Sequence, residues 1–318
     1  MTQIRKDKII KEKKVKESIN NSKFKEQLML ITGKEMLDIA RKNKFSVPAF
    51  NAGSGQLLTA VMETAERLNA PFMMAIHPDE LAFLKDSFIS QVIYECNHSK
   101  IPVCIHLDHG ANMQQVAHAI QLGFTSVMID SSHQPFDENI RITKEVVKLA
   151  HSVGVSVEAE LGTIGDTGST VEGGASEIIY TDPLKAKEFI EETKIDSLAV
   201  AIGTSHGIYP KHLVPKLRLD ILEEIYKLVS IPLVLHGGSS NADDELAASL
   251  DLGIAKINIS SDIKICFANK LREMLNGGNN EIREPNVLFP PCMLETQKVA
   301  EQKIKLFKAD NKASLYYR

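Results

Sequence analysis

Eight short apolar segments recur along this chain, and amphipathic helical patterns separate them. Residues 55–69, 112–123 and 138–154 place apolar side chains at the three- and four-residue spacing of a helix that covers a core. Parallel strands need a crossover connection, so strand-length segments that alternate with helices predict a parallel sheet. The eight segments cover residues 45–51, 71–77, 101–108, 125–130, 155–161, 196–203, 231–237 and 254–260.

The number and rhythm of these segments indicate the architecture. Strand–helix units at intervals of about 25 to 40 residues are typical of an α/β chain folded as a (β/α)8 TIM barrel. An open, doubly wound sheet is the rival, but it more often has fewer strands and a G-x-G-x-x-G turn, which this sequence lacks. From residue 265 onward, two further helical patterns and a Gly/Asn-rich loop predict a C-terminal helical tail, packed on the barrel or on a neighbouring subunit.

The first residues differ in composition from the rest of the chain. Residues 1–28 are dense in lysine, which predicts a solvated extension that is disordered or forms an appended helix. Residues 29–318 are expected to form one barrel domain that includes the C-terminal helices, since a chain of this size can bury one large core. Met29 is a candidate start of the native chain, because the regular pattern begins there and Thr32 can cap the first helix.

Charge and cysteine content argue against several classes of protein. The formal net charge of −4 gives no basic field, so nucleic acid is not expected as a partner. The four cysteines show no C-x-x-C spacing, which predicts neither a disulfide framework nor a cysteine zinc site. No apolar run has the length of a membrane span, and the start has no signal-peptide hydrophobic region. We therefore expect a cytoplasmic protein with a small-molecule partner.

Polar and ionisable side chains follow nearly every predicted strand. In a barrel, the carboxyl ends of the strands and the loops after them converge on one mouth. Buried ionisable groups cost several kcal/mol unless they are paired or bound to a metal, so a purely structural barrel would gain nothing from them. The residues at these positions are Asn51, His77, Asp108, His109, Asp130, Glu158, Glu160, Ser205, His206, His236, Asn258, Ser260 and Ser261.

Three histidines of this set follow different strands. His109 comes after the third predicted strand, His206 after the sixth and His236 after the seventh. Any one of them alone would more often be a hydrogen-bonded core residue than a metal ligand. Three imidazoles that converge with a fourth position open describe a catalytic zinc site. His106, inside the third strand, is expected to pack or hydrogen-bond in the barrel instead of binding zinc.

Glycine-rich turns lie beside two of these histidines. Such turns after the late strands of a barrel expose backbone N–H groups that hold phosphate, although ordinary tight turns have the same composition. Polar residues after the eighth strand add side-chain donors on the same side, so a phosphorylated substrate is favoured. The residues concerned are Gly207, Gly237, Gly238, Ser239, Asn258, Ser260 and Ser261.

Lys256, within the eighth predicted strand, raises the alternative of an imine-forming lysine. That role needs an unprotonated amine in reach of the substrate. The three histidines make it the weaker interpretation.

Four motifs, LDHG, AVAIGTSHG, LVLHGGS and KINIS, occur in this order. Together they resemble the class II, zinc-dependent fructose-bisphosphate and tagatose-bisphosphate aldolase family, and the resemblance runs from about Leu30 to the C-terminus. It implies a lyase of glycolysis that cleaves a ketose 1,6-bisphosphate, first of all fructose 1,6-bisphosphate, into dihydroxyacetone phosphate and glyceraldehyde 3-phosphate. It also implies a homodimer or homotetramer, and a monovalent cation, Na⁺ or K⁺, near the phosphate.

The resemblance implies roles for particular residues. His109, His206 and His236 would bind the catalytic Zn²⁺, and Asp108 would donate and accept the proton at the aldehyde-derived hydroxyl. Asp130 and Glu160 match residues at a second or alternative divalent metal position. The predicted substrate-binding residues are Asn51, Gly207, Gly237, Gly238, Ser239, Asn258, Ile259, Ser260 and Ser261.

The chain departs from the family pattern in three places. The loop after the fifth predicted strand reads GDTGSTVEGG where many relatives carry a mobile acid–base glutamate; Glu172 is the nearest candidate for that role, and Asp166 is the alternative. Ser260 stands where fructose-specific relatives often have aspartate, and His77 stands where many have serine. Tagatose 1,6-bisphosphate, another phosphorylated sugar or a deoxy-keto acid is therefore the alternative substrate.

Two other functions compete with an aldolase. A barrel metallohydrolase would carry an H-x-H pair at the end of the first strand, where this chain has VPAFNAG. A non-catalytic binding protein could use the lysine-rich extension and the outer helices, but it would not explain metal-type ligands at the barrel mouth.

Overall fold

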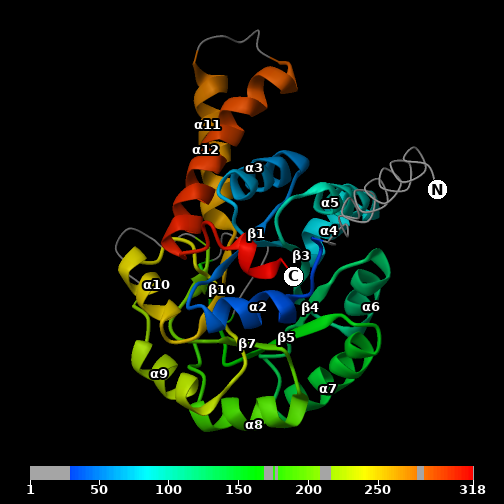
Figure 1. Ribbon diagram of the computed structural model, residues 1–318, viewed down its shortest axis with the longest axis vertical. Coiled ribbons are helices and arrows are strands. Elements are labelled where there is room, and N and C mark those ends of the chain that lie inside the picture. The colour runs from blue at the N-terminus through cyan, green and yellow to red at the C-terminus, as the bar shows by residue number, and fades with distance from the viewer. Residues whose placement is uncertain (1–28, 168–174, 176–177, 208–215, 278–282, 318) are drawn as a thin grey trace, which may run out of the picture.

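Eight parallel strands close into one barrel, in the order β1-β10-β9-β7-β5-β4-β3-β2 (Figure 1). The computed structural model describes residues 29–167, 175, 178–207, 216–277 and 283–317. Each of the eight predicted segments supplies one barrel strand, so the predicted TIM barrel is confirmed. The barrel strands are β1 (Val47–Asn51), β2 (Phe72–Ile76), β3 (Val103–Gly110), β4 (Ser126–Ile129), β5 (Ser156–Leu161), β7 (Ser197–Val200), β9 (Leu233–Leu235) and β10 (Ile254–Ile259).

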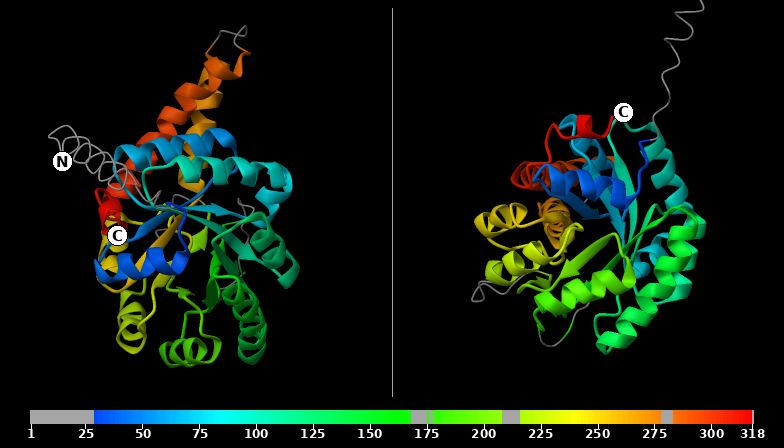
Figure 2. Two further views of the ribbon diagram at one scale, coloured as in Figure 1. Left: turned by 45° about the vertical axis from the view of Figure 1, so that its right-hand side comes forward. Right: turned by 60° about the horizontal axis from the view of Figure 1, so that its bottom comes forward.

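Helices surround this barrel and connect its parallel strands (Figure 2). Their apolar faces pack on the strands, as the helical spacing of the sequence predicts. The connection between β2 and β3 contains two helices instead of one. The outer helices are α3 (Gly55–Arg67), α4 (Pro78–Leu84), α5 (Asp86–His98), α6 (Met113–Leu122), α7 (Phe136–Ser152), α8 (Pro183–Thr193), α9 (Leu219–Leu228) and α10 (Asp243–Leu250).

Helix α2 (Gly33–Lys42) covers the end of the barrel at which the strands begin (Figure 1). Thr32 caps it as expected, in a capping box with Glu35. A Cβ atom on Gly33 would lie 2.7 Å from Ser126 Oγ and 2.8 Å from Ser156 Oγ, and these serines are the first residues of β4 and β5. The helix is therefore in close contact with the strand starts, and the polar strand ends lie at the opposite end of the barrel.

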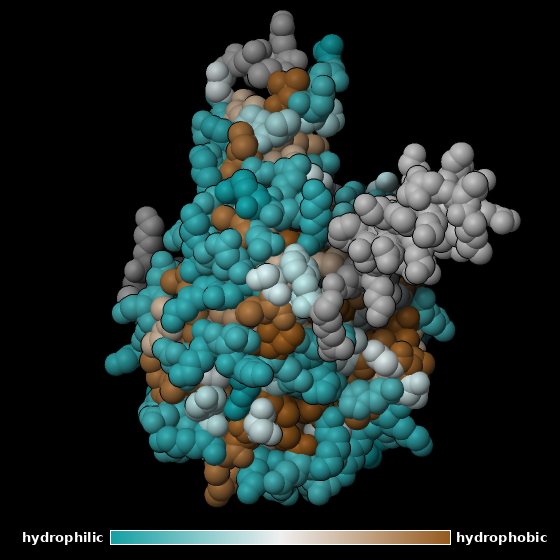
Figure 3. All heavy atoms as spheres, in the orientation of Figure 1, coloured by the Kyte–Doolittle hydropathy of each residue, from teal (hydrophilic) through white to brown (hydrophobic). Residues whose placement is uncertain are grey.

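The C-terminal tail is a helical hairpin of α11 (Ser261–Asn276) and α12 (Pro285–Leu306), followed by the short helix η1 (Ala313–Tyr316). Helix α12 packs on α3 of the same chain, and the far part of the hairpin projects beyond the barrel (Figures 1 and 2). Leu275, Val287 and Leu294 on this hairpin are exposed. The face of the hairpin seen in Figure 3 shows hydrophobic atoms among largely hydrophilic side chains. Within the described ranges, no helix combines the length and the apolar character needed to cross a bilayer.

Strand β3 is irregular at the LDHG motif. Its register with β4 shifts there, and His109 has a φ of 49°, in the left-handed region that non-glycine residues rarely adopt. Successive side chains of a strand normally point to opposite faces, but a bulge re-aims them. Asp108 and His109 consequently both approach His236. Gly110 follows because a Cβ atom in its place would lie 2.6 Å from the Met128 carbonyl oxygen.

We expect Gly110→Ala to destabilise the protein by about 1 to 3 kcal/mol, because overpacking at this position forces β3 away from β4. Gly55→Ala is the matched control, since its Cβ atom would meet only Gln91, at 3.7 Å. Urea unfolding followed by circular dichroism measures both variants. Equal free energies of unfolding for the two would show that the bulge tolerates a side chain.

Candidate metal centre and active site

The three histidines predicted from the sequence converge at the barrel mouth. His109 lies in β3, His206 lies in the short strand β8 (Ser205–His206) after β7, and His236 directly follows β9. All three are buried, and one ring nitrogen of each lies within 4.8 Å of those of the others. The ring centroid of His109 is 4.5 Å from that of His236 and 4.9 Å from that of His206. The cluster is small enough for one ion to contact all three imidazoles.

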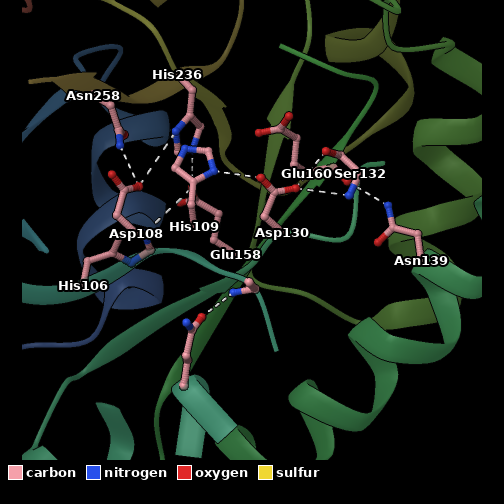
Figure 4. Close-up of polar contacts among 12 residues, drawn as sticks. His106, Asp108, His109, Asp130, Ser132, Asn139, Glu158, Glu160, His236 and Asn258 are labelled. Atoms are coloured by element: carbon pink, nitrogen blue, oxygen red, sulfur yellow. Dashed lines mark hydrogen bonds and ion pairs between the residues drawn. The ribbon is translucent and has the colours of Figure 1, made fainter. Parts of the chain in front are cut away.

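His109 is oriented by Asp130. Asp130 Oδ2 lies 2.8 Å from His109 Nδ1, and Asp130 Oδ1 accepts hydrogen bonds from the backbone N–H and hydroxyl of Ser132 (Figure 4). The other ring nitrogen, Nε2, is buried without a hydrogen-bond partner. Burial lowers the pKa of His109, but Asp108 and Asp130 outweigh burial and raise that pKa to about 10. The protein therefore favours positive charge at this point.

Asp108 is held at both carboxylate oxygens. Asn51 donates to Oδ2 at 2.7 Å. Asn258 donates to Oδ1 at 2.9 Å (Figure 4). Burial raises the pKa of Asp108, but the nearby His109, His236 and Lys256 side chains outweigh burial and hold that pKa well below its usual range. Asp108 is thus a fixed, ionised carboxylate beside the histidines. The sequence predicts substrate contact for Asn51 and Asn258, and the structure adds their hydrogen bonds to Asp108.

His236 offers one free lone pair to the cluster. Its Nε2 atom lies 2.8 Å from Glu158 Oε1, while its Nδ1 atom is buried without a hydrogen-bond partner and lies 3.9 Å from Asp108 Oδ1. Burial lowers the pKa of His236, which favours the neutral imidazole that binds metals. Unpartnered, buried nitrogens on His109 and His236, with His206 beside them, form a donor set that suits Zn²⁺ with a fourth position open.

A second group of possible ligands shares His109. Asp130 and Glu160 each place one oxygen within 4.8 Å of a His109 nitrogen and of each other. Glu160 Oε2 is buried without a hydrogen-bond partner. Burial and the nearby Asp130 carboxylate raise the pKa of Glu160 well above its usual range. A second divalent cation here would relieve the repulsion between the two carboxyl groups, so these residues fit the predicted second metal position.

Two pockets flank the histidine cluster and share His206. The first combines Asp108 with the predicted phosphate turns, whereas the second lies on the side of the second ligand group. Gly238 and Ile259 are packed behind the first pocket, where a Cβ atom on Gly238 would lie 2.4 Å from Ile257 Cγ2. The first pocket is lined by Asp108, His206, Gly207, Gly237, Ser239, Asn258, Ser260 and Ser261, and the second by His109, Asp130, Ser132, His133, Glu160, Thr163, Ile164, Ala175 and His206.

The loop after β5, which carries the candidates for the second acid–base group, starts beside His206 of the histidine cluster. Asp166 belongs to strand β6 (Gly165–Asp166), which pairs with β8 and sets Asp166 opposite His206. Thr167 then donates from its backbone N–H and its hydroxyl to the His206 carbonyl oxygen, at 3.0 and 2.8 Å. Glu172 lies outside the described residues.

His77 and Ser260, two of the departures from the family pattern, are linked through Glu80 and Lys264. Neither of these two linking residues was singled out in the sequence analysis. The backbone N–H of His77 donates to Glu80 Oε2 at 3.3 Å. Glu80 Oε1 lies 2.6 Å from Lys264 Nζ, and Lys264 donates to Ser260 Oγ at 2.8 Å. His77 Nδ1 also caps α4 by accepting from the Asp79 backbone N–H. In the sequence, Glu80 is visible only as an acidic residue in the first turn of α4, and Lys264 only as a lysine four residues after Ser260. Neither position indicates that the two side chains pair with each other.

Comparison with known proteins gives a consistent result. A family model described as class II fructose-bisphosphate aldolase matches residues 31–312. The fructose-bisphosphate aldolase of Staphylococcus aureus (strain Mu50 / ATCC 700699) is 37% identical over 289 residues, which cover 89% of this chain and 99% of that protein. The fructose-bisphosphate aldolase of Thermus caldophilus is 36% identical over 300 residues, with 88% and 98% covered. Among solved structures, the YdjI aldolase from Escherichia coli K12 matches with a TM-score of 0.77 at 31% identity, with 89% and 99% covered.

We expect the purified chain to retain Zn²⁺ through its three histidines. Alanine at His109, His206 or His236 removes one ligand and should weaken Zn²⁺ binding by at least about 100-fold. His118→Ala is the control, because His118 lies half-exposed on α6 and contacts Asp86. Titration against a chromophoric chelator measures the affinities. Unchanged affinity in all three variants would contradict this ligand set.

Proposed function

The chain belongs to the class II fructose-bisphosphate aldolase family, and from this premise we propose that it reversibly cleaves fructose 1,6-bisphosphate to dihydroxyacetone phosphate and glyceraldehyde 3-phosphate. The family is an aldehyde-lyase family that depends on zinc. The observation that carries the proposal is the buried cluster of His109, His206 and His236 with the ionised Asp108 fixed beside it.

The three histidines would hold the catalytic Zn²⁺. Bound there, the ion would act as a Lewis acid on the ketose oxygens and stabilise the negative charge that develops during cleavage. Asp130 and Glu160, with His109, would hold a second divalent cation. A monovalent cation, Na⁺ or K⁺, would sit near the phosphate.

Asp108 is the proposed acid–base group at the hydroxyl on C4. During cleavage it takes the hydroxyl proton, the C3–C4 bond breaks, C4 becomes the aldehyde carbon, and the electron pair of the bond stays on the dihydroxyacetone phosphate half. Asn51 and Asn258 suit this role because they fix both oxygens without protonating them. A second acid, Glu172 or alternatively Asp166, then protonates C3 of the dihydroxyacetone phosphate half.

The phosphate of the dihydroxyacetone half would bind in the first pocket. Gly207, Gly237, Ser239 and Ser261 line it, and α11 begins at Ser261, so the start of a helix borders the pocket, a place that suits an anion. Gly237 has a φ of 62°, and a Cβ atom there would lie 2.6 Å from the Ser205 carbonyl oxygen. Only glycine therefore lets this turn pass so close to β8.

We place the enzyme in the cytoplasm as a homodimer or homotetramer. The α11–α12 hairpin, which projects beyond the barrel (Figure 1), is the candidate subunit contact, and Leu275, Val287 and Leu294 are exposed on it. The relatives that share most of this chain are metabolic enzymes by name.

Ser260 is the residue that bears on the identity of the ketose bisphosphate. It stands where fructose-specific relatives often have aspartate, and Lys264, which donates to it, is paired with Glu80. Tagatose 1,6-bisphosphate, or another phosphorylated sugar or deoxy-keto acid, is accordingly the second candidate substrate.

Chelator treatment should abolish cleavage of fructose 1,6-bisphosphate, and added Zn²⁺ should restore it. Borohydride with substrate should leave the enzyme active, because no imine forms. A coupled assay of dihydroxyacetone phosphate measures the rates, with tagatose 1,6-bisphosphate assayed side by side at equal zinc content. Full activity in a metal-stripped sample would defeat the mechanism, and a higher kcat/KM on tagatose 1,6-bisphosphate would reassign the substrate.

Asp108→Ala should keep Zn²⁺ but lower kcat by about 100- to 10,000-fold, the range typical of a lost general acid–base group. The control is Asp220→Ala, which removes an exposed carboxylate on α9 that pairs with Arg218. Zinc content and steady-state kinetics are measured on both. A kcat for Asp108→Ala equal to that of the control would remove Asp108 from the mechanism.

A further inference from the structure

A lysine and a glutamate form an ion pair inside the barrel, beneath the histidines. Lys256 in β10 is fully buried, and its Nζ atom lies 2.7 and 2.9 Å from the two carboxylate oxygens of Glu158 in β5. The same Nζ atom lies 3.2 Å from Nε2 of His106 in β3. The three N–H bonds of the ammonium group thus have three acceptors.

Stability alone is a poor reason for such a pair. Removing two charges from water costs several kcal/mol each, and a well-packed apolar pair of similar volume is often equally stable or more so. Val47 and Val234, which pair with Lys256 in the neighbouring strands, are fully buried as well. The pair is therefore expected to serve a contact that apolar residues cannot make.

That contact is with His236. Glu158 Oε1 lies 2.8 Å from His236 Nε2 (Figure 4). A carboxylate paired with an ammonium group only accepts hydrogen bonds, so Nε2 must donate, and Nδ1 keeps its lone pair. Nδ1 is buried without a hydrogen-bond partner, and His236 belongs to the three-histidine cluster.

In His109 the unpartnered nitrogen is Nε2, whereas in His236 it is Nδ1. Asp130 accepts at Nδ1 of His109, which leaves Nε2 for the cluster. Asp130 keeps 23% of its side chain exposed, whereas the Glu158 side chain is 1% exposed. A carboxylate as deeply buried as that of Glu158 needs a cation beside it, and Lys256 supplies one.

We propose that the Lys256–Glu158 pair is a positioning device that holds His236 as the Nε2–H tautomer, with Nδ1 aimed at the metal position. This inference rests on the proposed metal-dependent function. His106 completes the device, because its Nε2 atom accepts from Lys256 while its Nδ1 atom lies 2.8 Å from Ser126 Oγ. Lys256 and Glu158 touch neither substrate nor metal in this scheme and act only through His236.

The test compares Glu158→Leu with the double variant Glu158→Leu/Lys256→Met. Glu158→Leu removes the acceptor for His236 Nε2–H and should weaken Co²⁺ and Zn²⁺ binding by about 10- to 100-fold, with an altered visible spectrum of the Co²⁺ form. The double variant contains no unpaired buried charge, so it should fold even if the single variant does not. Its metal affinity should stay low, because the acceptor for His236 is still missing.

A merely structural role predicts a different pattern. If the pair only balances charge, the double variant should bind Co²⁺ with the affinity and spectrum of the unmodified chain, and that result would overturn the proposal. The matched control is Asp196→Leu. Asp196 Oδ2 also lies 2.8 Å from a histidine nitrogen, Nε2 of His151, and His151 lies outside the histidine cluster. This control should change thermal stability but not the Co²⁺ spectrum.

Long-range ¹H–¹⁵N spectra of the unmodified, histidine-labelled chain give an independent readout. His236 should show a protonated Nε2 and an unprotonated Nδ1 both with and without Zn²⁺. The opposite tautomer would overturn the inference while leaving the aldolase proposal intact. Absence of zinc binding and of cleavage in the unmodified chain would instead remove the proposed function.

Discussion

Closure of eight parallel strands into one barrel is the constraint on which the rest of this structure depends. Because all strands run the same way, every carboxyl end meets the same rim. His109, His206 and His236 are far apart in the sequence, yet they follow strands that end at this rim and form one cluster. Helix α2 covers the opposite end, so the ionisable groups are concentrated at one mouth.

The second constraint is that charge placed inside this mouth must be compensated. Three carboxylates at this mouth are compensated in different ways: Asp108 accepts from two asparagines, Asp130 from Ser132 and His109, and Glu158 from Lys256 and His236. These contacts fix side chains in a medium where an unpaired charge would be costly. Compensation and orientation are thus achieved by the same hydrogen bonds, which leave particular histidine nitrogens without a protein partner.

Much of the architecture could be predicted from local pattern. The strand-length apolar segments and the helical spacing between them follow from backbone geometry, and all eight predicted strands form the barrel. The end of β3 was beyond such reasoning, because strict alternation would send Asp108 and His109 to opposite faces. A register shift and a left-handed His109 bring both to the mouth, and Gly110 leaves room for the Met128 carbonyl oxygen. The link from His77 through Glu80 and Lys264 to Ser260 also joins different elements, so no local pattern reveals it.

The sequence by itself determined the barrel, the position of polar residues at its strand ends and the set of histidines that could bind a metal. These properties depend on spacing along one chain segment at a time. Only the tertiary structure decided that His106 bonds to Lys256 and Ser126, that Lys256 pairs with Glu158, and which nitrogen of His109 and of His236 is left without a protein partner. The physical reason is that a ring nitrogen is assigned by the hydrogen bond made at the other one, and that bond comes from a residue on a different strand or loop.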